Sequence, residues 1–135
     1  MKQIAIKAGY GHIKSCYAVV NNFGHVHPYG VIRNLTELYD VCVDQDIDVM
    51  TIEDQYFTDD NKDTAKVLSR ITGNFEAVAL LLGKKCTFIP PSLWKAAYSR
   101  KTKKEVLASK ITGGFVLDLN LASAILIANY LGSKK

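Results

Sequence analysis

The stretch that decides the fold is Asp48-Val-Met-Thr-Ile-Glu-Asp-Gln-Tyr-Phe57. Its apolar residues predict a buried strand, and Glu53 lies near the end of that strand. An acidic residue is disfavoured in a strand, and an unpaired carboxylate is costly to bury. Two aromatic residues, Tyr56 and Phe57, follow closely, which is typical of the edge of an active site. The alternative is a glutamate that ends a strand and meets solvent, so the rest of the chain has to decide.

Length and composition predict one globular domain over residues 1–135, because 48% of the residues are hydrophobic and 22% are charged. The longest apolar run, Ala77–Leu82, is too short to cross a bilayer. No signal peptide follows Met1, so we expect a cytoplasmic protein with no membrane partner. The cysteines are Cys16, Cys42 and Cys86, without CxxC spacing, and we expect them to be reduced.

Charge is separated along the chain, although the net charge is only +4. Ten of the 13 acidic residues fall between Glu37 and Asp63. Between Lys84 and Lys110 the chain holds eight bases against Glu105 alone. The basic segment predicts a polyanion as partner, and the acidic segment indicates either solubility or a cation site.

The order of expected elements is that of an α/β protein. Gly73 interrupts the longest helix at a cost of about 1 kcal/mol against alanine, which suggests that another backbone packs close to it. Pro28 places its strand at a sheet edge. The expected strands are 3–7, 15–21, 25–32, the strand that ends near Glu53, and 86–89. The expected helices are 34–45 with Asn34 as N-cap, 61–82, 93–98 with Ser92 as N-cap, 102–111 and 119–131.

An ordered series of motifs extends over most of the chain. It comprises Ile6-Lys7-Ala8-Gly9, Ile52-Glu53-Asp54-Gln55-Tyr56, the segment from Phe88 to Lys95, Lys103-Lys104-Glu105-Val106, and Asn120-Leu-Ala-Ser123-Ala-Ile. In this order the motifs resemble those of the RuvC family of Holliday-junction resolvases. The last motif, at Ser123-Ala124, is more similar to the YqgF family of the same fold. The resemblance implies a ribonuclease H-like fold, in which helices flank a central mixed five-stranded sheet formed by a three-strand meander and two further strands.

In that family four carboxylates hold two Mg²⁺ ions. The positions matched here are Lys7, Glu53, Asn120 and Ser123, so only Glu53 keeps an acid. Lys7 would put an ammonium group where a divalent cation would sit, and we therefore expect no metal and no cofactor. Lys7 and Glu53 are expected on neighbouring strands, where they could form a salt bridge. The alternative is a site rebuilt from Glu53 and Asp118, which would use Mg²⁺.

The resemblance also implies where DNA would bind. Lys95 and Lys103 match lysines that the family places near the scissile phosphate. Tyr56 matches an aromatic residue that stacks on a base, although it could instead pack on its own loop. Three further bases widen the same basic surface: Arg100, Lys101 and Lys104. The long helix at 61–82 resembles the one on which the family's dimer packs, which predicts a homodimer.

These observations together favour a protein that binds branched or four-way-junction DNA without cutting it. One alternative is a metal-dependent resolvase with a relocated site. Another is an inactive relative that acts through protein–protein contacts, such as an inhibitor that pairs with an active resolvase. A compact protein of this kind suits a bacterium or a bacteriophage.

Overall fold

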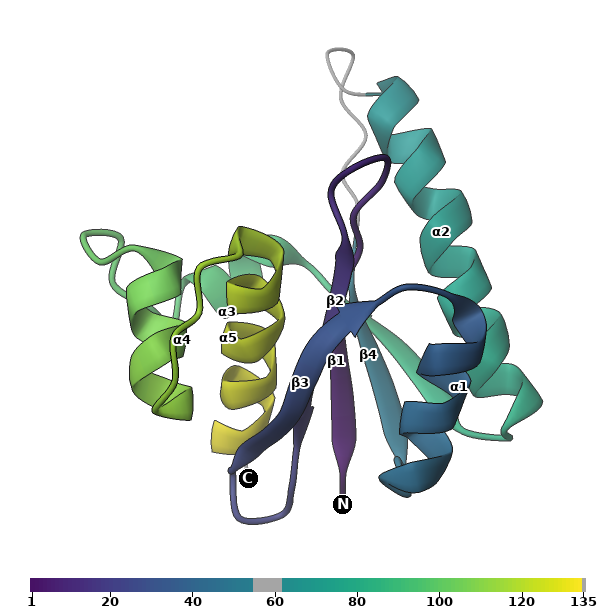
Figure 1. Ribbon diagram of the computed structural model, residues 1–135, viewed down its shortest axis with the longest axis horizontal. Helices are drawn as coiled ribbons and strands as arrows, with labels where there is room; N and C mark the ends of the chain where they lie inside the picture. The colour runs from purple at the N-terminus through teal and green to yellow at the C-terminus, as the bar shows by residue number, and fades with distance from the viewer. Residues whose placement is uncertain (55–61, 135) are drawn as a thin grey trace.

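The computed structural model describes residues 1–54 and 62–134. Its centre is one mixed sheet with strand order β3-β2-β1-β4-β5 (Figure 1). The strands β1, β2 and β3 form an antiparallel meander, and β4 and β5 run parallel to β1. The bounds are β1 Gln3–Lys7, β2 Ser15–Val20, β3 Val26–Ile32, β4 Val49–Glu53 and β5 Lys85–Ile89. The predicted α/β architecture with a mixed five-stranded sheet is confirmed.

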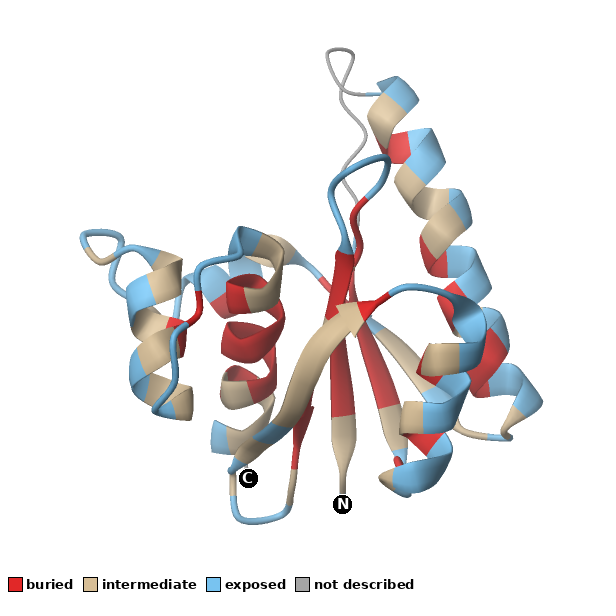
Figure 2. Cartoon of the chain, in the orientation of Figure 1, coloured by how far each residue is buried: buried red, intermediate tan, exposed pale blue. Residues whose placement is uncertain are grey.

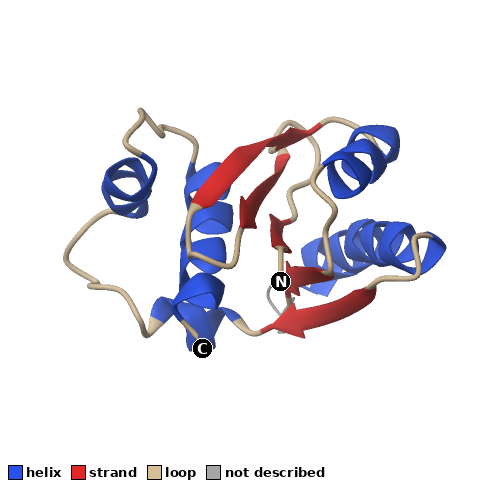
Figure 3. Ribbon diagram, turned by 90° about the horizontal axis from the view of Figure 1, so that it is seen from below, coloured by secondary structure: helices blue, strands red, loops and turns tan. Residues whose placement is uncertain are grey.

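Helices cover both faces of the sheet, as the view along it shows (Figure 3). On one face lie α1 (Leu35–Asp44) and α2 (Lys62–Leu81). On the other face α5 (Leu119–Ser133) packs against β1, β2 and β3, and it carries α3 (Pro91–Lys95) and α4 (Lys104–Thr112) on its outer side. Since the fold has two helical layers, the two faces of each central strand are both buried.

Two hydrophobic cores result from the alternation of side chains along the strands. Ile4 and Ile6 point into the core with α1 and α2, whereas Ala5 belongs to the core with α5. The middle of α5 is buried on all sides, and Figure 2 shows it as a continuous buried segment beside the sheet. A helix of this kind requires small and aliphatic residues throughout, and α5 supplies them from Ala122 to Ala128.

A side-chain cap explains where α1 begins, whereas α3 and α4 begin without one. Asn34 caps α1 as predicted, because its side-chain oxygen accepts a hydrogen bond from the Glu37 N–H group at 2.9 Å. The prediction that Ser92 caps the next short helix is wrong. Helix α3 already starts at Pro91, with Pro90 as its N-cap, since the fixed φ angle of proline suits the first helical turn. The basic helix starts two residues later than expected, at Lys104.

Other expectations from the sequence have mixed outcomes. Pro28 lies on the edge strand β3, as predicted. In α1 only Leu38 and Cys42 of the apolar stripe are buried, because this helix covers the margin of the sheet. Gly73 has no described atom within 4 Å of the position of an added Cβ, so no other backbone among the described residues packs close to it. All three cysteines are free, in agreement with the sequence.

None of the described helices is long and apolar enough to cross a membrane.

Candidate functional site

The site begins with the register of the two central parallel strands. Ile6 of β1 pairs with Ile52 of β4, so the next residues, Lys7 and Glu53, lie side by side where the two strands end. Ile6 and Ile52 point into the core with α1 and α2. Because side chains alternate along a strand, Lys7 and Glu53 point to the opposite face, which α5 covers.

Glu53 is buried and bonded at both carboxylate oxygens. Oε1 forms an ion pair with the Lys7 Nζ, which confirms the salt bridge expected from the sequence. Oε2 accepts a hydrogen bond of 2.8 Å from the Trp94 indole Nε1. Glu53 is only 2% exposed, so the alternative of a strand-end glutamate that meets solvent is wrong. A buried carboxylate is tolerated when a cation and hydrogen-bond donors satisfy it, which is the case here.

Trp94 was missed as a site residue by the sequence reasoning. It is the only tryptophan of the chain and is 1% exposed. The signal available in the sequence was its position after Pro90-Pro91, next to Lys95, in a segment that resembles the family pattern. That signal points to a basic surface and gives no indication that the indole reaches the carboxylate of β4.

Two further lysines lie close to the indole ring. The Nζ atoms of Lys95 and Lys104 are 5.7 Å and 5.5 Å from its centroid, which is the range of cation–π contacts. Burial lowers the pKa of Lys104, and the nearby charges of Lys95 and Lys7 lower it further. We call Lys7, Glu53, Trp94, Lys95 and Lys104 the Trp94 cluster. It brings three ammonium groups together around one carboxylate, and such a site attracts anions.

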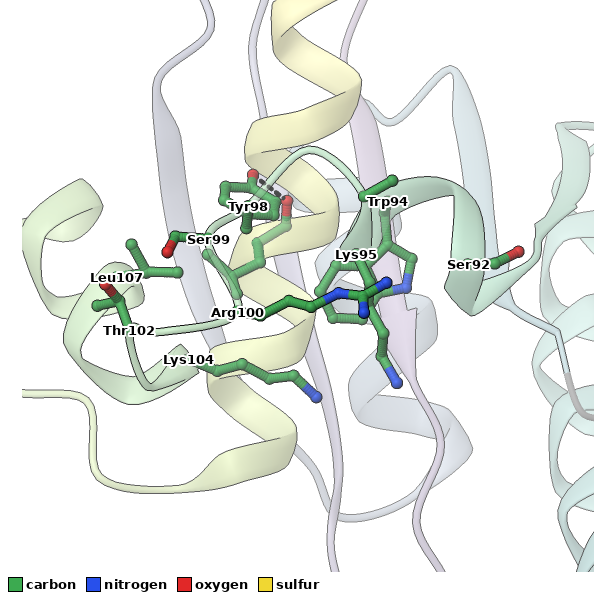
Figure 4. Close-up of a pocket in the computed structure, with 11 residues that line it drawn as sticks. Ser92, Trp94, Lys95, Tyr98, Ser99, Arg100, Thr102, Lys104 and Leu107 are labelled. Carbon is green, nitrogen blue, oxygen red and sulfur yellow. Dashed lines mark hydrogen bonds between the residues drawn. The ribbon is translucent and has the colours of Figure 1, made fainter.

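A pocket of about 430 Å³ opens beside this cluster, between α3, α4 and α5 (Figure 4). Three of the predicted DNA-binding residues line it, namely Lys95, Arg100 and Lys104. Lys101 and Lys103 are exposed in the segment between α3 and α4. Tyr56, the predicted stacking residue, lies outside the described residues. The other lining residues are Ser92, Trp94, Ala96, Tyr98, Ser99, Thr102, Leu107 and Leu126.

The two remaining matched positions lie in the first turns of α5. The Asn120 Nδ2 donates a hydrogen bond to the Lys14 carbonyl oxygen at 3.0 Å, and Ser123 is buried at 2% exposure. An added Cβ on Gly9 would lie 2.6 Å from the Ile13 oxygen and 2.9 Å from the Asn120 Nδ2. Asn120 therefore ties the loop after β1 to the start of α5, and Gly9 is required where the two approach.

Asp118, the acid considered for a rebuilt metal site, uses its carboxylate to cap a helix. It is the N-cap of α5, and its Oδ1 accepts a hydrogen bond from the Leu121 N–H group at 2.8 Å. The same oxygen lies 3.8 Å from the Cys16 Sγ, and burial together with Asp118 raises the pKa of this thiol to about 12.

The chemistry of this donor set does not fit a pair of Mg²⁺ ions. Mg²⁺ prefers oxygen ligands, above all carboxylates, whereas Lys7 contributes an ammonium group and Asn120 uses its amide to hold a backbone carbonyl. In the described parts of the chain, no group of three or more His, Cys, Asp or Glu side chains is placed to hold a metal ion. The site can instead bind an anion through its ammonium groups.

Comparisons with known proteins support the fold. No protein-family model matches the sequence, and no curated protein matches it either. The RuvC of Thermus thermophilus in complex with a Holliday junction substrate is similar to this chain with a TM-score of 0.78 and 18% identity, over 96% of this chain and 91% of that one. Another Thermus thermophilus RuvC structure gives a TM-score of 0.76 and 17% identity, over 96% and 92%. The yeast mitochondrial Holliday junction resolvase Ydc2 gives a TM-score of 0.48 and 13% identity, over 96% and 78%. The two Thermus structures show that this chain has the RuvC-like form of the ribonuclease H fold, as predicted.

Proposed function

We propose that this protein binds branched DNA, four-way junctions in particular, and does not cut it by the two-metal chemistry of RuvC-type nucleases. The observation that carries the proposal is the ion pair between Lys7 and Glu53 at the ends of the two central strands. Two-metal hydrolysis needs anionic ligands that clamp both ions around the scissile phosphate. In this chain the only acid at the four matched positions is already neutralised by a lysine.

Because Lys7 offsets the charge of Glu53, the positive charge of the neighbouring lysines can attract DNA phosphates without a metal ion. In the RuvC-type site, Mg²⁺ ions offset the repulsion between carboxylates and phosphate. Here the Trp94 cluster has three ammonium groups and one carboxylate, so it attracts phosphate by itself. Lys101 and Lys103 extend the positive charge onto the exposed segment beside it. Each phosphate contact of this kind adds affinity that falls as the salt concentration rises.

Two features of the RuvC resemblance complete the proposal. Tyr56, outside the described residues, is proposed to stack on a base at the opened centre of the junction, a contact worth about 1–3 kcal/mol. A homodimer is proposed to form through α2. The exposed side of this helix offers Gly73, with open space around it, and the apolar Leu80 and Leu81, which are 70% and 80% exposed. A second helix could approach closely at the glycine and cover the leucines.

The test is a gel-shift and cleavage assay on a synthetic four-way junction, with Mg²⁺, Mn²⁺ and EDTA in parallel. We expect the junction to be bound more tightly than linear duplex of the same length, equally in EDTA and in Mg²⁺, and to stay uncut. Metal-dependent cleavage that disappears in Glu53→Gln would show instead that the chain is a resolvase with a relocated site. Absence of junction binding at low salt would leave protein–protein contact as the function.

A pair of charge-matched variants localises the DNA-binding surface. The double variant Lys101→Glu, Lys103→Glu reverses two exposed charges beside the pocket. We expect it to weaken junction binding and to reduce the slope of the logarithm of the binding constant against the logarithm of the salt concentration by about two, which corresponds to two phosphate contacts. The control is Lys84→Glu, Lys85→Glu, which changes the net charge equally. Lys85 opens β5, opposite the end at which Glu53 lies, so the control should bind almost normally. Equal losses in both variants would contradict the proposed surface.

A further inference from the structure

The pocket beside the Trp94 cluster has features that backbone contacts with DNA would not require. Phosphates of a duplex are reached from an exposed surface, whereas this pocket has a volume of about 430 Å³. That volume falls in the range of small-molecule sites, roughly 300–1,000 Å³. The close-up shows Lys95, Arg100 and Lys104 extending toward one side of the pocket, while Tyr98 and Leu107 lie on the other (Figure 4). The pocket is therefore cationic at one side and largely apolar at the other.

Its aromatic walls are held in place by hydrogen bonds. The Tyr98 hydroxyl donates to the Leu126 carbonyl oxygen at 2.7 Å and accepts from the Asn129 Nδ2 at 2.9 Å. The Trp94 indole is held by its hydrogen bond to Glu53, and the ring of Tyr98 meets it edge to face at 6.5 Å. Rings that are fixed before a ligand arrives lower the entropic cost of binding.

The positive charges of the pocket repel one another. The Trp94 ring positions Lys95 and Lys104 on its surface, and burial together with the neighbouring charges of Lys95 and Lys7 lowers the pKa of Lys104. An anion between these ammonium groups would relieve the repulsion and raise the pKa of Lys104. A phosphate group suits such a site, because its several oxygens can accept hydrogen bonds from more than one cation at once.

We propose that this pocket binds a single nucleotide, with its phosphate on Lys95, Arg100 and Lys104 and its sugar and base along Tyr98 and Leu107. Ser99 and Thr102 also line the pocket, and their hydroxyl groups are available for the polar edges of a base. Trp94 supports the cations and does not itself stack on the base, because its ring is 1% exposed. Lys7 and Glu53 act as positioning residues, since they fix the indole on which Lys95 and Lys104 rest.

This inference rests on the proposed function, because the nucleotide that fits could be one extruded from a branched DNA or located at a strand end. The same chemistry is presented by a free deoxynucleoside monophosphate. Enzymes that take a base out of the helix use pockets of this kind, at a cost that is smallest where the base is already unpaired. The centre of a junction and a strand end both offer such nucleotides.

The single tryptophan provides a direct readout. In a two-dimensional ¹H–¹⁵N spectrum of the whole protein, the indole N–H of Trp94 gives one isolated signal, and its hydrogen bond to Glu53 makes the signal sensitive to the pocket. The probes are thymidine monophosphate, thymidine, inorganic phosphate, and a short single strand with a 5′-phosphate. We expect thymidine monophosphate to shift the signal saturably and to bind at least about ten-fold more tightly than thymidine or phosphate, because only the nucleotide fills both sides of the pocket. Tighter binding of the phosphorylated strand would identify DNA as the source, and tighter binding of the free nucleotide would identify the small molecule.

Two neighbouring alanines supply a matched pair of variants. Ala96 lines the pocket, whereas Ala97 is exposed and does not line it. Ala96→Phe should fill the pocket and lower nucleotide affinity at least about ten-fold, while Ala97→Phe should leave it unchanged. The two substitutions add the same side chain to an exposed position, and circular dichroism checks that both variants are folded.

The proposal is overturned if thymidine monophosphate causes no saturable shift, if inorganic phosphate binds as tightly as the nucleotide, or if Ala97→Phe weakens binding as much as Ala96→Phe. These results are distinguishable from a failure of the proposed function. If the wild-type protein binds four-way junctions in a gel shift but does not bind the nucleotide, only the proposal of a nucleotide pocket is refuted. A protein that binds the nucleotide but no junction refutes branched-DNA binding alone.

Discussion

Removing the ammonium group of Lys7 should destabilise the protein through Glu53. In Lys7→Met the buried carboxylate keeps its hydrogen bond from Trp94 but loses its ion pair with Lys7. Breaking a fully buried ion pair costs about 3–5 kcal/mol. The side chain of Lys7 is 25% exposed, whereas that of Glu53 is only 3% exposed. Because the pair reaches solvent at the lysine, water compensates for part of this loss. We therefore expect a decrease of about 2–3 kcal/mol in the free energy of unfolding, or roughly 10 °C in Tm for a chain of this length.

A double-mutant cycle separates the ion pair from other effects of the substitution. Glu53→Gln removes the charge and keeps a carbonyl oxygen that can accept from the Trp94 indole. The double variant Lys7→Met, Glu53→Gln leaves no uncompensated charge, so it should lose much less stability than the sum of the two single variants. A coupling energy of about 2 kcal/mol is expected for residues in such direct contact.

Urea unfolding followed by the fluorescence of Trp94 and by circular dichroism measures all four proteins. The tryptophan signal reports the site itself, and circular dichroism reports the whole fold. Free energies that add to within about 0.5 kcal/mol would refute the reasoning, because they would mean that Lys7 and Glu53 do not stabilise each other. A change in the urea dependence of one variant alone would instead indicate an altered unfolded state.

Further predictions concern packing, metal binding and pH. Gly9→Ala should destabilise the protein by about 1–3 kcal/mol, because the new methyl group would lie 2.6 Å from a backbone oxygen. Gly73→Ala, on the exposed side of α2 with no described atom within 4 Å of the new Cβ, should stabilise one chain by up to about 1 kcal/mol and weaken the proposed dimer, as thermal melts and sedimentation would show. Lys7→Asp should place two carboxylates side by side at Glu53, so Tm should fall in EDTA and rise on addition of Mn²⁺; a Tm that does not respond to Mn²⁺ would contradict this. Because the pKa of Lys104 is lowered, its charge is lost at a lower pH than that of an ordinary lysine, so nucleotide or DNA affinity should fall as the pH rises toward 10.5. Lys104→Arg should remove that part of the pH dependence, since arginine stays charged, and an unchanged pH profile in titrations would argue against a role for Lys104.

Local patterns in the sequence were sufficient for the order and the approximate bounds of the strands and helices, whereas the fold itself was predicted from the resemblance of the motifs to the RuvC family. Period-two alternation located the strands, and period-3.6 spacing located the helices to within one or two residues at most ends. The cap at Asn34 and the edge position of Pro28 also follow from local chemistry, since a side-chain oxygen near free N–H groups and a missing N–H group act within a few residues. At Pro91 and Ser92, the preference of proline for the first helical turn competes with the preference of serine for the N-cap, and the sequence predicted the wrong cap.

The candidate site was predicted in part. The sequence placed Lys7 and Glu53 on neighbouring strands, and their ion pair follows from the parallel register of β1 and β4. It also indicated a basic surface from Lys95 to Lys104, and the structure brings Lys95, Arg100 and Lys104 to one pocket. Helix α1 shows the limit of such patterns, because its apolar stripe is regular but three of its five residues remain exposed at the margin of the sheet.

The sequence by itself thus determined the order of strands and helices, the loss of acids at the matched positions and the separation of charge. Only the tertiary structure decided what Glu53 does. Its hydrogen bond to Trp94 joins residues 41 apart, and the contact depends on how α3 packs at the end of the sheet. Periodicity records which side of an element is buried, but it carries no information on which distant side chain fills the space opposite. A carboxylate that looked like an active-site acid is therefore, in the folded chain, the support of an indole ring that holds two lysines at the edge of a pocket.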